Sequence, residues 1–542
     1  MVDSRRGWTR REFLKLAGKA GLLSAAPGLA GVAAAFDEET VCLSILHTTD
    51  IHGHILPTSD YDGNADRGGL ARCVTQIRRW RNENPNSILI DAGDVYQGTD
   101  VSLRTRGELM IDLFNCLGYD AWVVGNHEFD WGMDCFQSAL QRSAMPVLAA
   151  NMLLDGKAAG QFADAKHPFA KIQPFILKEI GGIKLAIVGV TTPGMAYWLP
   201  REFTRGLDFP NPVEPVRRAI AQAKGEGADA VVLAGHMGLK PRTGGDDFAN
   251  SVMALTTEFP ETAVFIAGHT HQAIPSRLIN GVLFTQADHF GLHAGRVDLL
   301  FDRDSKKWLG RRASCQLMDD RVPLDPVVIS RAKSQLAESQ HALAQPIGEL
   351  AETLRARARR GAPSDLENLI GAAVKEALLE RNVPVDGVMH GVFDENGSLA
   401  AGRVTVGDIW NVLPYENYIV TAQLTGDEIQ AVMQEVCSGS ERRSLLGFNV
   451  QSEGRGAHCR VIAITQANGG PLERGKKYVI AFNSFDARSA GHHFMKLRAL
   501  LDRPAARCTM HPVQIRDAVI GYFLRHKIVH RVAQTSPLSL AA

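Results

Sequence analysis

Five short polar segments of the chain each follow a run of apolar residues and carry groups that bind metals or move protons. They are Asp50-x-His52, Asp91-Ala92-Gly93-Asp94, Gly125-Asn126-His127-Glu128, Gly235-His236 and Gly268-His269-Thr270-His271. Each segment alone is typical of a solvated turn at the end of a strand. Together they are informative, because open α/β sheets gather their functional groups outside the carboxyl ends of the strands.

The residue types in these segments suit divalent metal ions. Carboxylates and imidazoles bind Zn, Mn, Fe or Co, and one aspartate can bridge two ions about 3.5 to 4 Å apart. In extended chain, the i, i+2 spacing of Asp50-x-His52 and of His269-x-His271 puts both side chains on one side. A pair of ions acidifies a shared water molecule and stabilises the charge of in-line attack, so a phosphate ester is the natural substrate.

Short apolar runs alternate with helix-like stretches from about residue 40 to residue 300. The runs are Val41–Leu46, Ser87–Ile90, Ala121–Val124, Lys184–Val190, Ala230–Leu233 and Ala263–Ala267. This alternation predicts an α/β domain with buried sheets. After Asp325 the pattern changes: residues 328–345 are predicted as a linker helix, and residues 346–530 mix helices and strands as an α+β domain, before a short tail over 531–542.

The composition is that of an ordinary globular protein. The 542 residues include 59 basic and 59 acidic side chains, so the formal net charge of zero provides no overall field that would attract a nucleic-acid polymer. The eight cysteines are scattered without a Cys-x-x-Cys pair, and most are expected to be small buried hydrophobes. Their spacing leaves any disulfide pairing open.

The first 35 residues differ from the rest. Arg10 and Arg11 precede a Gly/Ala-rich, mildly apolar stretch that ends at Ala33-Ala34-Ala35, small residues that a signal peptidase accepts. This segment resembles a twin-arginine signal peptide, and its glycines and Pro27 make it a poor permanent membrane span. We therefore expect a periplasmic or extracytoplasmic protein that uses the twin-arginine export machinery, with cleavage after Ala35 left open.

The five polar segments resemble those of the calcineurin-like metallophosphoesterases, and the form GNHEFDWG resembles the 5'-nucleotidase family within them. The resemblance spans about Leu46 to Phe494. It implies a four-layer α/β domain over residues 36–327, with two packed β-sheets flanked by helices. It also implies a 5'-nucleotidase-type substrate-binding domain over residues 346–530.

Carried over residue by residue, the resemblance implies two divalent metal ions, Zn, Mn or similar. Asp50, His52, Asp94 and His271 hold one ion, and Asp94, Asn126, His236 and His269 hold the other. His127 is then a catalytic residue that binds no metal, faces the scissile phosphate and is oriented by Asp130. Glu128 is expected to orient the turn by hydrogen bonds.

In the second domain the resemblance implies that Tyr415 and Phe485 stack on a nucleotide base. The chain departs from the family here: His390 to Asn396 replace an Asn-Gly-Gly-Gly-x-Arg segment and lack its arginine. Arg360 could match another family arginine, and Arg488 could compensate locally.

The resulting hypothesis is an exported dimetal phosphohydrolase that acts on nucleotides by in-line attack of a metal-bridging hydroxide. One alternative on the same fold is a thiosulfohydrolase, and another is a phosphodiesterase acting on cyclic nucleotides or nucleotide sugars. A non-enzymatic envelope binding protein is disfavoured, because all seven metal positions hold competent donors. The expected partner is a small phosphate ester.

Overall fold

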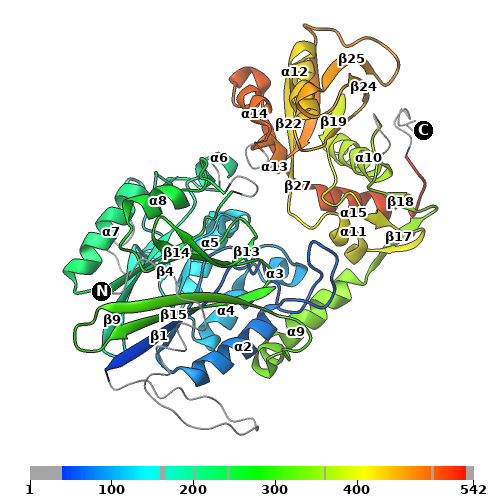
Figure 1. Cartoon of the computed structure of the whole chain (residues 1–542). Helices are drawn as coiled ribbons and strands as arrows, with labels where there is room; N and C mark the ends of the chain where they lie inside the picture. Colours follow the sequence, from blue (N-terminus) through cyan, green and yellow to red (C-terminus); the bar gives the residue numbers. More distant parts are fainter. Residues whose placement is uncertain are drawn as a thin grey trace. The chain divides into compact units, whose positions relative to one another are not determined.

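The computed structural model describes residues 39–158, 161, 167–199, 203–240, 244–358, 362–489 and 493–532. The chain divides into two compact units, Met1–Leu336 and Ala337–Ala542, and each is described by itself (Figure 1). The export signal predicted over residues 1–35 lies outside the described residues. Among the helices that are described, none is long and apolar enough to cross a lipid bilayer.

Two sheets form the centre of the first unit. The seven-stranded sheet has the order β16-β15-β1-β2-β3-β4-β7, and the six-stranded sheet has the order β13-β14-β12-β11-β9-β8. The strands of the first are β1 (Thr40–Thr48), β2 (Ser87–Asp91), β3 (Ala121–Val123), β4 (Val147–Leu148), β7 (Ile172–Gln173), β15 (His293–Asp302) and β16 (Trp308–Leu317). Those of the second are β8 (Phe175–Ile180), β9 (Ile183–Val190), β11 (Ala230–Gly235), β12 (Val264–Ala267), β13 (Ala273–Ile279) and β14 (Val282–Ala287).

The inner strands run parallel, and antiparallel strands complete both sheets. Strands β1, β2, β3, β4 and β7 are parallel neighbours, while β15 and β16 pair antiparallel at one edge. In the second sheet β9, β11, β12 and β14 are parallel, with β8 and β13 antiparallel at the two edges. The carboxyl ends of the parallel strands therefore meet at one end of each sheet.

The two sheets pack face to face with helices outside. Successive strand residues point to opposite faces, so Ile88 and Ile90 of β2 enter the core between the sheets, together with Val232 and Ala234 of β11. Leu89 points outward, to the core that the helices form on the first sheet. The flanking helices are α2 (Leu70–Glu83), α4 (Glu108–Leu117) and α5 (Met133–Arg142) on the first sheet, and α7 (Val213–Gly225) and α8 (Val252–Glu258) on the second. This arrangement confirms the predicted layers of two packed sheets and flanking helices.

Short elements connect these layers. They are α3 (Asp100–Arg104), the 3-10 turns η2 (His127–Phe129) and η3 (Pro168–Lys171), α6 (Met195–Trp198), and a small sheet of β5 (Leu153–Leu154), β6 (Lys157–Ala158) and β10 (Leu207–Asp208). Helix α9 (Pro326–Leu343) contains the boundary between the two units.

The second unit is an α+β body. Its main sheet has the order β23-β19-β26-β22-β27, formed by β19 (Gly387–His390), β22 (Tyr418–Thr425), β23 (Ser444–Leu446), β26 (Lys477–Asn483) and β27 (Thr509–Gln514). The smaller sheets contain β17 (Pro346–Leu350), β21 (Gly402–Thr405) and β28 (Ile528–Val529), the pair β18 (Leu354–Arg355) and β20 (Ser398–Leu399), and the hairpin β24 (Phe448–Glu453) and β25 (Arg460–Gln466).

Sequence signals at the helix starts explain several helices of this unit. A capping box, in which a Ser or Thr and an acidic residue three positions later bond each other's backbone, begins α10, α11 and α12. The helices are α10 (Asp365–Leu379), α11 (Val406–Val412), α12 (Gly426–Ser438), α13 (Ser484–Ala487), α14 (Met495–Leu501) and α15 (Ile515–His526), with 3-10 turns η4 (Gly456–His458) and η5 (Pro504–Ala506).

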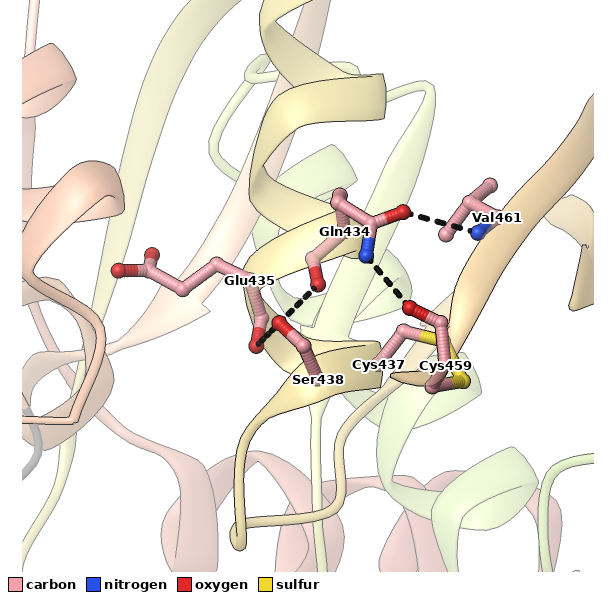
Figure 2. The surroundings of a disulfide bond; sticks show 6 residues. All are labelled: Gln434, Glu435, Cys437, Ser438, Cys459 and Val461. Atoms are coloured by element: carbon pink, nitrogen blue, oxygen red, sulfur yellow. Dashed lines mark hydrogen bonds between the residues drawn. A yellow bond between two sulfur atoms is a disulfide. The ribbon is translucent and has the colours of Figure 1, made fainter. Parts of the chain in front are cut away.

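A disulfide bond joins the end of α12 to the segment before β25 (Figure 2). It links Cys437 to Cys459, 22 residues apart. The Gln434 side chain reinforces the junction, because its amide donates to the Cys459 carbonyl at 2.7 Å and accepts from the Val461 backbone N–H at 2.9 Å. The hairpin and the helix are thus joined by one covalent bond and two hydrogen bonds.

Candidate dimetal centre

The five polar segments follow strands of both sheets in the first unit. Parallel register aligns Thr48 of β1 with Asp91 of β2, and Gly235 of β11 with Ala267 of β12. Each segment therefore leaves its sheet at the same level as its neighbour. The structure brings six of the predicted ligands together in two groups, Asp50 with His52 and His271, and Asp94 with His236 and His269; in each group the ligand atoms lie within 4.8 Å of one another.

The first group is held at short distances. The Nε2 atoms of His52 and His271 are 3.2 Å apart, and His271 Nε2 lies 3.4 Å from Asp50 Oδ1. Two imidazole nitrogens and a carboxylate oxygen converge, which is a donor set for a divalent cation. The residue types in this group therefore fit such an ion.

The second group places a carboxylate oxygen near the first group. Asp94 Oδ2 lies 3.0 Å from His236 Nε2 and 3.7 Å from His52 Nε2. The Asn126 side-chain oxygen is 3.2 Å from His236 Nε2. Asp94 thus lies between the two groups, and Asn126 adjoins the second.

The backbone adopts unusual conformations at these residues. Five of the six grouped residues have positive φ angles, Asp50, His52, Asp94, His269 and His271, between 49° and 72°. Such angles are strained for residues other than glycine and cluster at functional sites. Backbone hydrogen bonds hold them, because Asp50 N–H donates to Gly93 O and His52 N–H to Asp94 O, both at 2.9 Å.

One glycine makes the close approach of two turns possible. A Cβ on Gly125 would lie 2.2 Å from Asp94 Oδ1, so a side chain there would collide with the shared carboxylate. Glu128 then joins the same turns. Its buried carboxylate accepts from the backbone N–H groups of Asp94, Val95 and Gly125 at 2.7 to 3.1 Å. Glu128 therefore fixes the turns rather than facing the ligand groups.

Main-chain carbonyls orient two of the imidazoles. His52 Nδ1 lies 2.8 Å from the Gln97 carbonyl, and His236 Nδ1 lies 2.8 Å from the Ala92 carbonyl. A carbonyl only accepts, so each Nδ1 carries the hydrogen and each Nε2 is left to bind a metal.

The charge states of these groups follow from burial and neighbouring carboxylates. Burial lowers the pKa of His52 and His269 to about 3, so both rings are neutral at pH 7, the state in which imidazole binds a metal. Burial also acts to lower the pKa of His236, but the Asp94 carboxylate outweighs it and raises that pKa to about 9. A cation at Asp94 would compete with that proton.

His127 stands beside the first group. Its Nδ1 is 2.6 Å from Asp130 Oδ2, its backbone N–H donates to Asp94 Oδ1 at 2.8 Å, and its ring centroid lies 5.2 Å from that of His52. Burial would lower its pKa, yet the carboxylates of Asp130 and Asp94 raise it to about 10. The ring is therefore protonated at neutral pH and 31% of its side chain is exposed.

Three aromatic neighbours were missed by the sequence reasoning. The Tyr61 hydroxyl is 3.1 Å from His271 Nδ1, the His289 ring stacks on the His271 ring with centroids 4.7 Å apart, and the Trp198 ring stacks on that of His269 at 5.1 Å. His289 comes two residues after β14. The pattern that identified the other turns, polar residues directly after an apolar run, could therefore have predicted it. No sequence signal marks Tyr61 or Trp198.

The predicted substrate-binding residues belong to the second unit. Phe485, in the first turn of α13, is 52% exposed, and its backbone N–H donates to the Asn417 side chain at 3.3 Å. Tyr415 contacts the ring of Phe393 with centroids 5.0 Å apart. Phe393 comes from the segment in which the chain departs from the family pattern. Arg360 lies outside the described residues.

The sequence reasoning also missed an arginine in this unit. Arg443 donates to both carboxylate oxygens of Asp486, from Nε at 2.8 Å and from Nη2 at 2.9 Å, and its Nη1 donates to the Arg442 carbonyl. Arg443 is thus occupied by protein partners. It fixes α13, which carries Asp486, and so holds the start of the helix that bears Phe485.

Comparisons with known proteins agree with this architecture. Residues 43–273 match the family model for calcineurin-like phosphoesterases, and residues 346–498 match the model for the 5'-nucleotidase C-terminal domain. The trifunctional nucleotide phosphoesterase protein YfkN of Bacillus subtilis is 28% identical over 300 residues, 49% of this chain and 20% of that protein. The snake venom 5'-nucleotidase of Naja atra is 27% identical over 506 residues, 84% of this chain and 91% of that protein.

The chain spans less than half the length of the first three curated relatives that it matches. Among solved structures, the 5'-nucleotidase precursor of Thermus thermophilus is 23% identical with a TM-score of 0.68, over 90% of this chain and 97% of that chain. The sulfate thiohydrolase SoxB of Thermus thermophilus is 19% identical with a TM-score of 0.63, over 94% and 96%. The likeness to these structures confirms the predicted two-domain fold.

Proposed function

We propose that this chain, which combines a calcineurin-like metallophosphoesterase domain with a 5'-nucleotidase C-terminal domain, hydrolyses phosphate esters of nucleotides with two divalent metal ions. The observation that carries the proposal is the position of Asp94 Oδ2, within 3.0 Å of His236 Nε2 and 3.7 Å of His52 Nε2. One carboxylate oxygen near two ligand groups is what a bridging aspartate requires.

The proposed ligands divide between two ions. One ion takes Asp50, His52, Asp94 and His271; the other takes Asp94, Asn126, His236 and His269. When bound, the ions would polarise the phosphoryl oxygens and acidify a water molecule. The chain itself holds the donors in place through the strained turns and through the carbonyls that orient His52 and His236.

His127 is proposed as the residue that assists the leaving oxygen. Asp130 occupies its Nδ1, so Nε2 is the nitrogen left to donate a hydrogen bond or a proton. The pKa of about 10 keeps the ring charged at neutral pH. Two cations close by would bring that pKa toward neutrality, which suits a group that gives up a proton during the reaction.

The second unit is proposed to bind the nucleoside part of the substrate. Phe393 and Phe485 are each 52% exposed, and Tyr415 packs against Phe393. Stacking of a base on an aromatic side chain contributes about 1 to 3 kcal/mol and tolerates different bases. We therefore propose that these rings, with Arg360 as a further candidate, favour nucleotides over simple phosphate esters.

The arrangement of the ligand residues is also compatible with other leaving groups. A sulfate thiohydrolase shares the fold over 96% of its chain, so the fold does not choose between phosphoryl and sulfur chemistry. His127, held by Asp130 and charged at neutral pH, favours transfer of a phosphoryl group, which carries more negative charge on its oxygens than a sulfuryl group does. Cyclic nucleotides and nucleotide sugars remain alternative substrates, because they too contain a phosphoryl group that could be transferred.

We further propose that the protein works outside the cytoplasmic membrane and reaches it by the twin-arginine route. The disulfide between Cys437 and Cys459 supports an oxidising compartment, because such bonds are rare in a reducing cytosol. Cell fractionation tests this proposal: the full chain should be exported, and the variant Arg10→Lys with Arg11→Lys should stay inside. Unchanged export of that variant would contradict the route.

A phosphate-release screen tests the activity. It would use nucleoside monophosphates, cyclic nucleotides and nucleotide sugars with defined Mn²⁺, Zn²⁺ or Co²⁺, alongside sulfate release from a thiosulfonate. We expect phosphate release from at least one nucleotide, and its loss on chelation. Sulfate release without any phosphate release would overturn the proposal in favour of thiosulfohydrolysis.

A further inference from the structure

His271 differs from two other histidines of the ligand groups in the partner that its Nδ1 contacts. His52 and His236 are almost completely buried, and each donates from Nδ1 to a main-chain carbonyl at 2.8 Å. His271 is 22% exposed, and its Nδ1 lies 3.1 Å from the side-chain hydroxyl of Tyr61. When Nε2 binds a metal, Nδ1 carries the hydrogen, so the Tyr61 oxygen is its acceptor.

Tyr61 lies at the tip of a closed surface loop. Thr58 and Arg67 exchange two backbone hydrogen bonds at 2.8 and 2.9 Å, which close the loop at its base. The Asp60 carboxylate accepts from the backbone N–H of Asn64 at 2.8 Å and forms an ion pair with Arg67 at 3.4 Å. These bonds brace the loop that carries Tyr61, whose side chain is 50% exposed.

A ring stack completes the contact. The Tyr61 ring lies on that of His289 with centroids 4.2 Å apart, and the His289 ring lies on that of His271 at 4.7 Å with an angle of 9°. Asp288 holds His289 Nδ1 at 2.7 Å, and the backbone N–H of Phe290 donates to the carbonyl of Asp50. The turn that supports Tyr61 is thus tied to a residue of the same ligand group.

We propose that Tyr61 is a positioning residue for the metal site of Asp50, His52 and His271. The inference rests on the proposed dimetal centre. Its physical basis is the second partner of a ligating imidazole: the Tyr61 oxygen orients the His271 ring, as the buried Gln97 carbonyl orients that of His52. Removal of one outer hydrogen bond of this kind lowers metal affinity about 10- to 100-fold.

Mn²⁺ binding to the full chain, stripped with a chelator, tests the proposal. Free Mn²⁺ measured by electron paramagnetic resonance should show two ions in the wild type. Tyr61→Phe keeps the ring stack and removes only the hydroxyl, and it should raise the dissociation constant of one ion about tenfold. The other ion should bind as before, and excess Mn²⁺ should restore the activity of the variant.

Two further variants sharpen the test. Tyr197→Phe is the matched control, because Tyr197 is 41% exposed and packs on Phe248; both Mn²⁺ constants should stay unchanged. Asp60→Ala should weaken the same ion as Tyr61→Phe by loosening the loop. Wild-type binding of fewer than two ions would contradict the dimetal centre itself. Two ions whose constants Tyr61→Phe leaves unchanged would overturn the role of Tyr61 and leave the centre standing.

Discussion

The dimetal centre of the first unit and the aromatic side chains of the second unit are built in different ways. The centre consists of buried turns whose backbones bond to one another, as Asp50 does to Gly93 and His52 to Asp94. Phe393 and Phe485 are half exposed, and Phe485 depends on the α13 start that Asn417 and Arg443 hold. Under the proposed function, the first arrangement would fix positions for bond cleavage, and the second would leave surface available to bind different bases.

The largest expected effect comes from the shared carboxylate. Asp94→Ala removes a ligand from both proposed ions, and loss of metal stabilisation worth several kcal/mol predicts at least about a 10³-fold fall in kcat. Metal content measured by mass spectrometry should fall below one ion per chain. Asp91→Asn is the control, because Asp91 bonds Thr48 and Gly93 rather than the ligand groups. A variant Asp94→Ala that kept both ions would break the idea of a bridging residue.

The second largest effect is expected from substitution of His127, and it should separate the chemical step from metal binding within the centre. His127→Gln is expected to lower kcat about 10²- to 10⁴-fold, the usual contribution of a general acid or base. Its metal content should match the wild type, because His127 belongs to neither ligand group. Asp130→Asn should lower kcat less, since the imidazole remains. Full turnover by His127→Gln would show that the ring serves only to pack against His52.

The contrast between locally determined turns and contacts set by the fold also explains which features the sequence predicts. Each ligand turn follows an apolar run, and the predicted run Ala263–Ala267 becomes β12 (Val264–Ala267). Local pattern therefore identifies the parallel strands and their carboxyl ends. It does not identify β15, which pairs with β1 across more than 240 residues, because that partner is chosen by sheet packing rather than by local sequence.

Side-chain partners between distant loops are equally beyond local pattern. Tyr61 meets His271 and Arg443 meets Asp486 only because the fold brings their loops together. The disulfide is a similar case, since the spacing of eight cysteines permits many pairings and the structure selects Cys437 with Cys459. The segment His390 to Asn396 departs from its family, and the structure shows that it supplies Phe393 beside Tyr415.

A disulfide variant should affect the two units unequally. Cys437→Ser with Cys459→Ser opens a loop of 22 residues, which predicts a loss of about 3 kcal/mol in the unfolding free energy of the second unit. The metal content of the first unit should not change. Denaturant unfolding monitored by hydrogen exchange measures the unfolding free energy of each unit. Cys315→Ser, at a cysteine of the first unit that forms no disulfide, is the control. An equal loss in both units would mean that they do not unfold independently.

The smallest effect should appear in the second unit as a change in KM. Phe485→Ala removes a stacking surface worth about 1 to 3 kcal/mol, which corresponds to a rise in KM of about 5- to 150-fold for a nucleotide. The kcat should stay close to wild type, because the residue lies outside the proposed metal centre. For a phosphate ester without a base, KM should not change at all. Ile462→Ala is the matched control, since Ile462 is a similarly exposed apolar residue on β25 of the same unit.

If Phe485→Ala instead lowered kcat for both substrates, the aromatic side chains would be acting on the reaction itself. The division between a unit that cleaves and a unit that selects would then be wrong.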